Sequence, residues 1–149
     1  MKLGTKAQTL KNIQPYLKNS HVPFFILFKQ LELSYEIEVV LEKIFKNFPS
    51  KEIIIRSSSV LEDRENDSKA GHFLSIPLKG NYSRKILSDT LFLVSESMGF
   101  SNENQIIVQS FVPDIELSGV IMTRDLSSGA PYYCINYIES KVDSSGVTS

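Results

Sequence analysis

Hydrophobic residues follow two different spacings along the first two thirds of the chain. Apolar side chains that recur every three or four residues predict three amphipathic helices, over residues 5–17, 34–48 and 83–98. Short apolar runs bounded by turn residues predict three strands, over residues 24–28, 52–56 and 72–78. The hydrophobic pattern lapses between the last two strands, so we expect a polar loop there, from Ser57 to Ala70.

The last third of the chain favours strands alone. Three apolar segments separated by turn residues are expected to be strands, over residues 105–112, 117–123 and 131–138. Helices and strands mix early and strands dominate late, which predicts an α+β fold. We expect a mixed or antiparallel sheet with two or three packed helices. The three isoleucines at 53–55 favour a strand that is buried on both faces.

Composition and charge limit the partners of the protein. The chain has 149 residues, which suits one domain, and 16 basic against 17 acidic residues leave a net charge of −1. This balance provides no basic patch for nucleic acid or an anionic membrane, so neither is expected as a partner. No apolar run is long enough to span a bilayer, and the N-terminus is too polar for a secretory signal. Together with a single cysteine, Cys134, these features favour a cytoplasmic protein.

Arg56 is the first candidate for binding chemistry. It ends the isoleucine strand and is followed by three serines, Ser57 to Ser59. Arginine is always charged and binds phosphate oxygens through paired hydrogen bonds, while serine hydroxyls and loop amides add neutral donors. Farther along, Gly71 would let the backbone approach a ligand closely. The alternative is an arginine that only caps a polar surface loop, and the residues alone do not separate the two.

Lys6 and Gln109 are weaker candidates. Lys6 opens the first expected helix, where its ammonium group could reach a phosphate. Gln109 interrupts an apolar strand, and its amide, with the backbone of Phe111 and Val112, could read the edge of a purine ring. The commoner alternatives are a solvated lysine and a glutamine that bonds to backbone at the edge of the core.

Several other chemistries lack their motifs. The sequence has neither the G-x-x-x-x-G-K-[ST] phosphate loop nor the G-x-G-x-x-G dinucleotide motif. Two histidines and one cysteine do not provide a zinc ligand set. No G-x-S-x-G nucleophile elbow is present.

The candidate segments, taken in order, resemble the N-terminal nucleotide-binding domain of the phosphoenolpyruvate synthase and pyruvate phosphate dikinase family. The family's Gly-x-Lys-Ala-x-x-Leu helix start is matched by residues 4–10, and its Arg-Ser-Ser strand end by residues 56–58. The other matches are Val22-Pro23, Glu62-Asp63, Ser68-Lys69-Ala70-Gly71, Val108-Gln109, Ser118-Gly119-Val120 and Thr123-Arg124-Asp125. The opening Gly4-Thr5-Lys6 is similar to relatives linked to surface-polysaccharide synthesis, one of which phosphorylates the amide of glutamine.

This resemblance implies an ATP-grasp-like fold, in which two subdomains clasp ATP, and it implies that this chain is the N-terminal nucleotide-binding subdomain. It also implies a role for seven residues. The phosphates would be contacted by Lys6, Arg56 and Ser57, covered by a loop with Gly71 and Ser75, and the adenine would be held by Gln109 and Val112.

The resemblance also implies parts that this sequence does not contain. In the family, the carboxylates that hold magnesium, the phosphohistidine domain and the acceptor domain all follow later. We therefore expect residues 1–149 to be a partial ATP-grasp domain without catalytic or metal-binding residues of its own. The parent would be a kinase that passes a phosphoryl group from ATP through a histidine to a small acceptor, pyruvate or an amide such as glutamine. The isolated chain would bind ATP weakly at most and would not turn it over, because the Mg²⁺ ligands lie elsewhere.

Two alternatives stay open at this point. A shortened gene could keep the subdomain as a non-catalytic regulatory or oligomerisation module. An unrelated α+β domain would require the ordered matches to be accidental. Whether the chain is an enzyme fragment or a non-catalytic module, an exposed edge of its sheet could pair with a second copy, because unpaired strand edges template further pairing.

Overall fold

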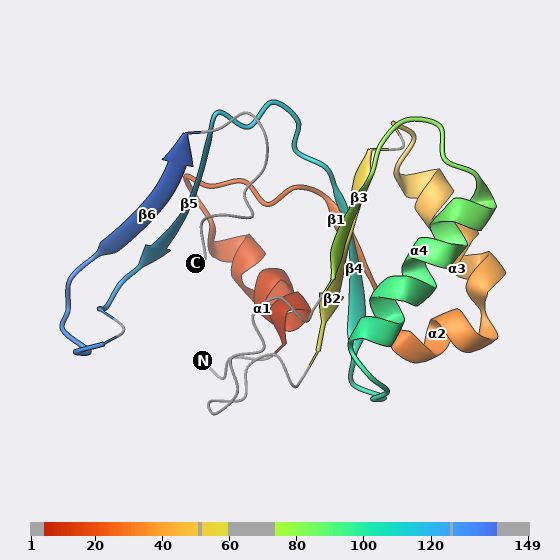
Figure 1. Ribbon diagram of the computed structural model, residues 1–149, viewed down its shortest axis with the longest axis horizontal. Coiled ribbons are helices and arrows are strands. Elements are labelled where there is room, and N and C mark those ends of the chain that lie inside the picture. Colours follow the sequence, from red (N-terminus) through yellow and green to blue (C-terminus); the bar gives the residue numbers. More distant parts are fainter. Residues whose placement is uncertain (1–4, 51, 60–73, 126, 140–149) are drawn as a thin grey trace. The chain divides into compact units, whose positions relative to one another are not determined.

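The protein is α+β and divides into two units. The computed structural model describes residues 5–50, 52–59, 74–125 and 127–139. The first unit, Met1–Phe111, contains a four-stranded antiparallel sheet and four α-helices. The second unit, Val112–Ser149, contains a two-stranded antiparallel hairpin. Figure 1 labels the elements of both units.

A capping residue fixes the start of the first helix, and a proline fixes its end. Thr5 caps the first helix through its hydroxyl, which accepts from the Gln8 N–H, and the Gln8 side chain accepts from the Thr5 N–H. Pro15 lies in the short 3-10 turn that follows, so the first helix ends earlier than the hydrophobic spacing predicts. No helix in the described ranges is long and apolar enough to cross a membrane. The helical segments are α1 (Lys6–Ile13), η1 (Gln14–Tyr16), α2 (Gln30–Tyr35), α3 (Ile37–Asn47) and α4 (Arg84–Ser97).

Helix α2 is the element that the hydrophobic pattern does not predict. It starts directly after a strand, where the backbone N–H of Lys29 donates to the Glu32 carboxylate. Ser34, where the second expected helix would begin, lies inside α2 instead. The break falls at Glu36, whose φ of −135° and ψ of 32° are not helical. The expected helix over residues 34–48 is therefore the end of α2 followed by α3.

All six strands lie close to their expected positions. The first unit has the order β1-β4-β2-β3, and every neighbouring pair is antiparallel. Strand β2 runs through Ser57 and Ser58, which the sequence had assigned to the loop. The strands are β1 (Phe25–Lys29), β2 (Ile53–Ser58), β3 (Ser75–Leu78), β4 (Gln105–Ser110), β5 (Leu117–Met122) and β6 (Cys134–Glu139).

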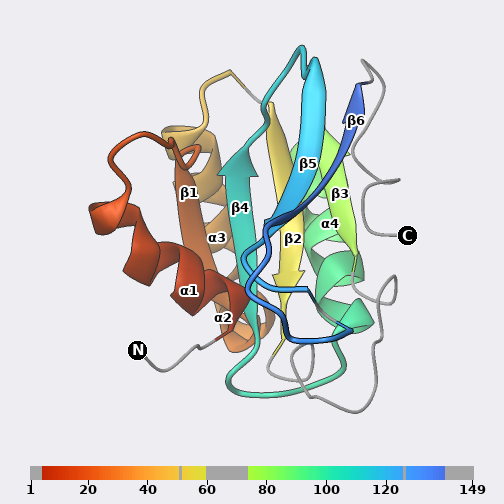
Figure 2. The same ribbon diagram turned by 90° about the vertical axis from the view of Figure 1, so that its left-hand side faces the viewer.

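The two faces of the four-stranded sheet are covered differently. Figures 1 and 2 show α2, α3 and α4 on one face and α1 on the other. The hydrophobic core lies under α2, α3 and α4, where alternate strand residues such as Ile55 and Val108 point. Ile54 points to the α1 face and is only half buried, so the expectation that all three isoleucines are buried is wrong for this one. On the same face Ile107 is fully buried, so β4 is the strand that is covered on both faces.

A buried glutamine connects elements that are far apart in sequence. The Gln30 side-chain amide donates to the carbonyls of Ser95 and Gly99 at 3.0 and 2.9 Å. Its side-chain oxygen accepts from the Ser101 N–H at 3.2 Å and from the Asn104 amide at 3.1 Å. One side chain thereby ties the start of α2 to the end of α4 and to the entry of β4.

Replacing Gln30 by alanine should destabilise the first unit by about 2–3 kcal/mol, since buried partners would lose their hydrogen bonds. Urea denaturation followed by circular dichroism measures this loss as a change in free energy of unfolding. Gln14→Ala is the matched control, because Gln14 is an exposed glutamine of η1. Equal stabilities of the two variants would show that the buried amide does not hold these elements together.

Candidate functional site

Arg56 lies on the face of the sheet that α1 covers. In the register of the sheet, Arg56 is opposite Ser75 of β3 and Ile107 of β4. The residue is half buried, and its Nε atom is buried without a hydrogen bond to any residue that the structure describes. Buried polar groups are normally bonded, and a guanidinium always carries its charge. Its buried N–H therefore lacks a hydrogen-bond partner among the described residues.

The start of helix α1 docks on the same face of the sheet. The backbone N–H of Ala7 donates to Ser58 Oγ at 2.9 Å, and the Thr5 hydroxyl donates to Gln105 Oε1 at 3.3 Å. Ser58 follows Arg56 by two residues in β2, so both side chains point to this face. The N-terminus of a helix carries partial positive charge. Two sources of positive potential, Arg56 and the start of α1, are thus adjacent.

Gln109 lies on this face as well, toward the other end of β2. It is opposite Ile54, so it is diagonal to Arg56, an arrangement that separates Cα atoms by about 7–8 Å. Its side chain is 7% exposed, and its amide reaches the Pro23 carbonyl at 3.5 Å, the outer limit of a hydrogen bond. Ser58 lies four positions beyond Ile54 in β2, which corresponds to about 13 Å along the strand.

The other expected ATP-binding residues lie in different places. Ser57 is 1% exposed, and the alternation of β2 turns its side chain toward the helical core, away from Arg56. Val112 is exposed and belongs to the second unit, which is described by itself. Gly71 lies outside the described residues. On one face of the sheet the structure thus brings together Arg56, Ser75, Gln109 and the start of α1, where Lys6 lies.

Ser58 and Gln105 contribute to this face but were not among the expected ATP-binding residues. Ser58 is fully buried and holds the first turn of α1, while Gln105 bonds to the cap residue Thr5. The signal that would have found Ser58 is the period of two in a strand. Once β2 is extended past Arg56, the second serine and not the first shares the face of the arginine.

Arg56 forms no ion pair with a residue that the structure describes. An ion pair elsewhere in the first unit joins Arg84 to Glu38 at 2.9 Å, and both of its side chains are exposed. Within the described ranges no group of three histidine, cysteine, aspartate or glutamate side chains could hold a metal ion. The arrangement around Arg56 is therefore suited to an anion.

Two motifs of the second unit have explanations inside the hairpin itself. A Cβ atom on Gly119 would lie 2.8 Å from the Asn136 carbonyl oxygen and 3.2 Å from Tyr137 Cβ, so glycine is required by the close strand pairing. Asp125 begins the turn between β5 and β6. Its Oδ1 accepts hydrogen bonds from the backbone and side chain of both Ser127 and Ser128, at 2.6–3.2 Å.

These hydrogen bonds lower the pKa of Asp125 from 3.8 to about 2, with the Ser128 hydroxyl as the largest cause. Because the pKa of Asp125 is lower in the folded state, its ionised carboxylate stabilises the folded turn at pH values above the unfolded pKa. This contribution is lost as the pH falls from about 3.8 through about 2.

Carbon-13 NMR of the side-chain carboxyl should show Asp125 titrating near pH 2. In Ser128→Ala the midpoint should move upward toward the ordinary aspartate value, because the strongest donor is removed. An unchanged midpoint in this variant would mean that the serine bonds do not hold the turn.

Comparisons with known proteins identify no relative. No family model matches the chain, and no curated protein or solved structure is detectably similar to it.

Proposed function

We propose that this chain is the ATP-binding part of a dikinase-like phosphotransferase that acts in the cytoplasm. The parent enzyme would move a phosphoryl group from ATP through a phosphohistidine to a small acceptor, pyruvate or an amide such as glutamine. The proposal rests on the resemblance of the ordered motifs and on the arrangement of the residues in those motifs that the structure describes.

The observation that carries the proposal is that Arg56 and the start of α1 lie on the same face of the sheet. Three of the motifs, around Lys6, Arg56 and Gln109, lie far apart in the sequence but meet on one face of the sheet. Arg56 Nε has no hydrogen-bond partner among the described residues, and the helix N-terminus docked at Ser58 adds positive potential. The negative charge of a phosphate would complement both positive potentials, and the Arg56 guanidinium could bind two phosphate oxygens at once.

The two ends of the proposed site suit the two ends of a nucleotide. Gln109 would meet the adenine and Arg56 the phosphates, with Ser75 opposite Arg56 on the neighbouring strand. The run of about 13 Å from the level of Gln109 to that of Ser58 is on the scale of an extended nucleoside triphosphate. A lysine at the first position of α1, Lys6, would add a mobile charge near the phosphates.

Phosphoryl transfer needs more than these residues provide. Arginine and the helix start neutralise charge on the phosphates and fix their position, which is a large part of such catalysis. Mg²⁺ would supply the remaining neutralisation, and in the resembled family its carboxylate ligands come from a later segment. By itself this chain would therefore bind ATP without transferring its phosphoryl group.

Arg56→Ala should weaken ATP binding by about tenfold or more, because charge-assisted hydrogen bonds contribute roughly 1.5–3 kcal/mol. Isothermal titration of ATP with Mg²⁺ measures the change. Adenosine should bind the variant and the original chain equally, since Arg56 is assigned to the phosphates and not to the base.

Arg84→Ala is the matched control, because Arg84 is an exposed arginine of α4. Circular dichroism should confirm that both variants stay folded, and Arg56→Lys keeps the charge if the alanine variant does not. ATP affinity that is unchanged in Arg56→Ala and Arg56→Lys would refute the assignment of this face to the phosphates.

A further inference from the structure

The two edges of the four-stranded sheet differ in their ability to accept another strand. On β3, the Ser57 N–H donates to the Leu74 carbonyl at 3.1 Å. In an antiparallel ladder, pairing groups alternate, so Ser75 and Pro77 are the residues of β3 whose backbone faces outward. Proline has no N–H, so the outward row of donors on β3 is interrupted at Pro77.

The edge of β1 is open in comparison. The Ser110 N–H donates to the Phe24 carbonyl at 2.8 Å and the Gln30 N–H to the Asn104 carbonyl at 3.0 Å. The same alternation turns the N–H and C=O groups of Phe25 and Leu27 away from β4. At the third outward position, the Lys29 N–H is already bonded to Glu32.

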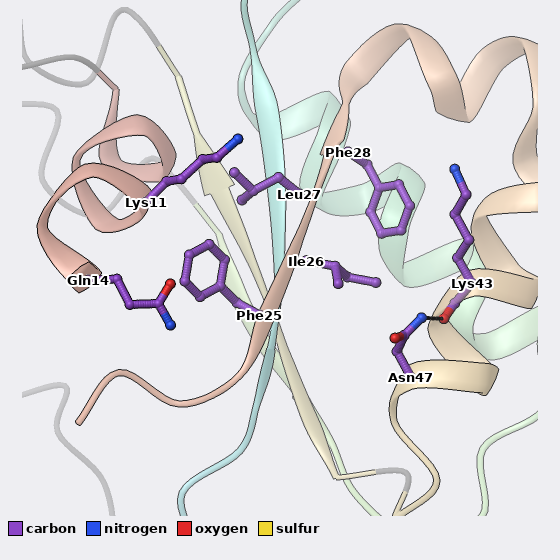
Figure 3. Close-up of a pocket in the computed structure, with 8 residues that line it drawn as sticks. All are labelled: Lys11, Gln14, Phe25, Ile26, Leu27, Phe28, Lys43 and Asn47. Atoms are coloured by element: carbon purple, nitrogen blue, oxygen red, sulfur yellow. Dashed lines mark hydrogen bonds between the residues drawn. The ribbon is translucent and has the colours of Figure 1, made fainter.

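A hollow of about 460 Å³ lies along this open edge (Figure 3). Phe25 and Leu27 point to its α1 side, whereas Ile26 and Phe28 point to its α3 side. The floor of the hollow is therefore the apolar edge strand itself. Its rim is polar and consists of Lys11, Gln14, Lys43 and Asn47.

The rim carries positive charge on both sides of the sheet. Lys11 comes from α1 and Lys43 from α3, so the two ammonium groups flank the edge from opposite faces. Neither lysine forms an ion pair with a residue that the structure describes. An occupant of the hollow thus meets two positive charges, one above and one below the plane of the sheet.

We propose that the edge of β1 binds an extended acidic peptide segment, which joins the sheet as a fifth strand. Outward N–H and C=O groups at Phe25 and Leu27 would give the backbone pairing. Successive side chains of a strand alternate between faces, so adjacent acidic residues would reach Lys11 and Lys43 respectively. A second copy of β1 fits less well, because pairing would bring like-charged lysines of the two copies together.

A short blocked peptide with the sequence Thr-Val-Thr-Val-Asp-Glu-Val-Thr-Val-Thr provides the probe, titrated into the full chain and followed by amide NMR. Binding should protect the outward amides of Phe25 and Leu27 from hydrogen exchange. The amides of Ile26 and Phe28, which already pair with β4, should change little. A peptide with Lys-Lys in place of Asp-Glu should bind at least about tenfold more weakly.

Two kinds of variant separate backbone pairing from charge. Lys11→Glu combined with Lys43→Glu should weaken binding of the acidic peptide about tenfold, whereas Lys85→Glu on α4 should leave it unchanged. Leu27→Pro removes an outward donor without breaking the ladder to β4, and should abolish the protection at Phe25. If the proline variant does not fold, the double lysine variant and Lys85→Glu still test whether the acidic peptide binds at this edge.

Three results would overturn the proposal. The first is no binding of the acidic peptide, and the second is binding without protection of Phe25 and Leu27. The third is a concentration-dependent dimer in light scattering that protects the same two amides without peptide, which would assign the edge to a second copy of this chain.

Discussion

The pairing of β2 with β4 is the constraint on which the first unit depends. Ile55 is opposite Val108 and both enter the core, while Arg56 is opposite Ile107 on the other face. A slip of one residue would exchange the faces, burying Arg56 under the helices and exposing isoleucine. Because an unpaired buried charge is costly, one register is strongly preferred. The hydrophobic core thereby fixes where the arginine of the candidate site lies.

A second level of order comes from polar groups inside the core. The Gln30 side chain bonds to the end of α4 and to the loop before β4. It therefore holds the start of α2, the end of α4 and the entry of β4 together. Burial of a glutamine is tolerated only because four partners satisfy it. The entry of β4 is thus positioned by hydrogen bonds, and the rest of β4 by apolar packing.

The sequence predicted the strands and the fold class because alternation and apolar runs are local signals. It did not predict α2, which is too short to show a helical period and begins in a capping bond of Lys29. It also placed Ser57 beside Arg56, since a loop does not impose the alternation that a strand does. For the candidate site, spacing in the sequence predicted which segments carry Lys6, Arg56 and Gln109. Their meeting on one face depends on the strand order, which no local pattern encodes.

Pro77 also has a consequence for assembly of the sheet. A sheet that accepts strands at both edges can be extended without limit, and this is how ordered aggregates grow. In the four-stranded sheet the donor row of β3 is interrupted, whereas β1 presents two outward residues with both groups intact. A second copy that paired at β1 would therefore present its own β3, with the interrupted donor row, as the outer edge of the joined sheet. The asymmetry of the two edges thus works against repeated extension of the four-stranded sheet through copies of this chain.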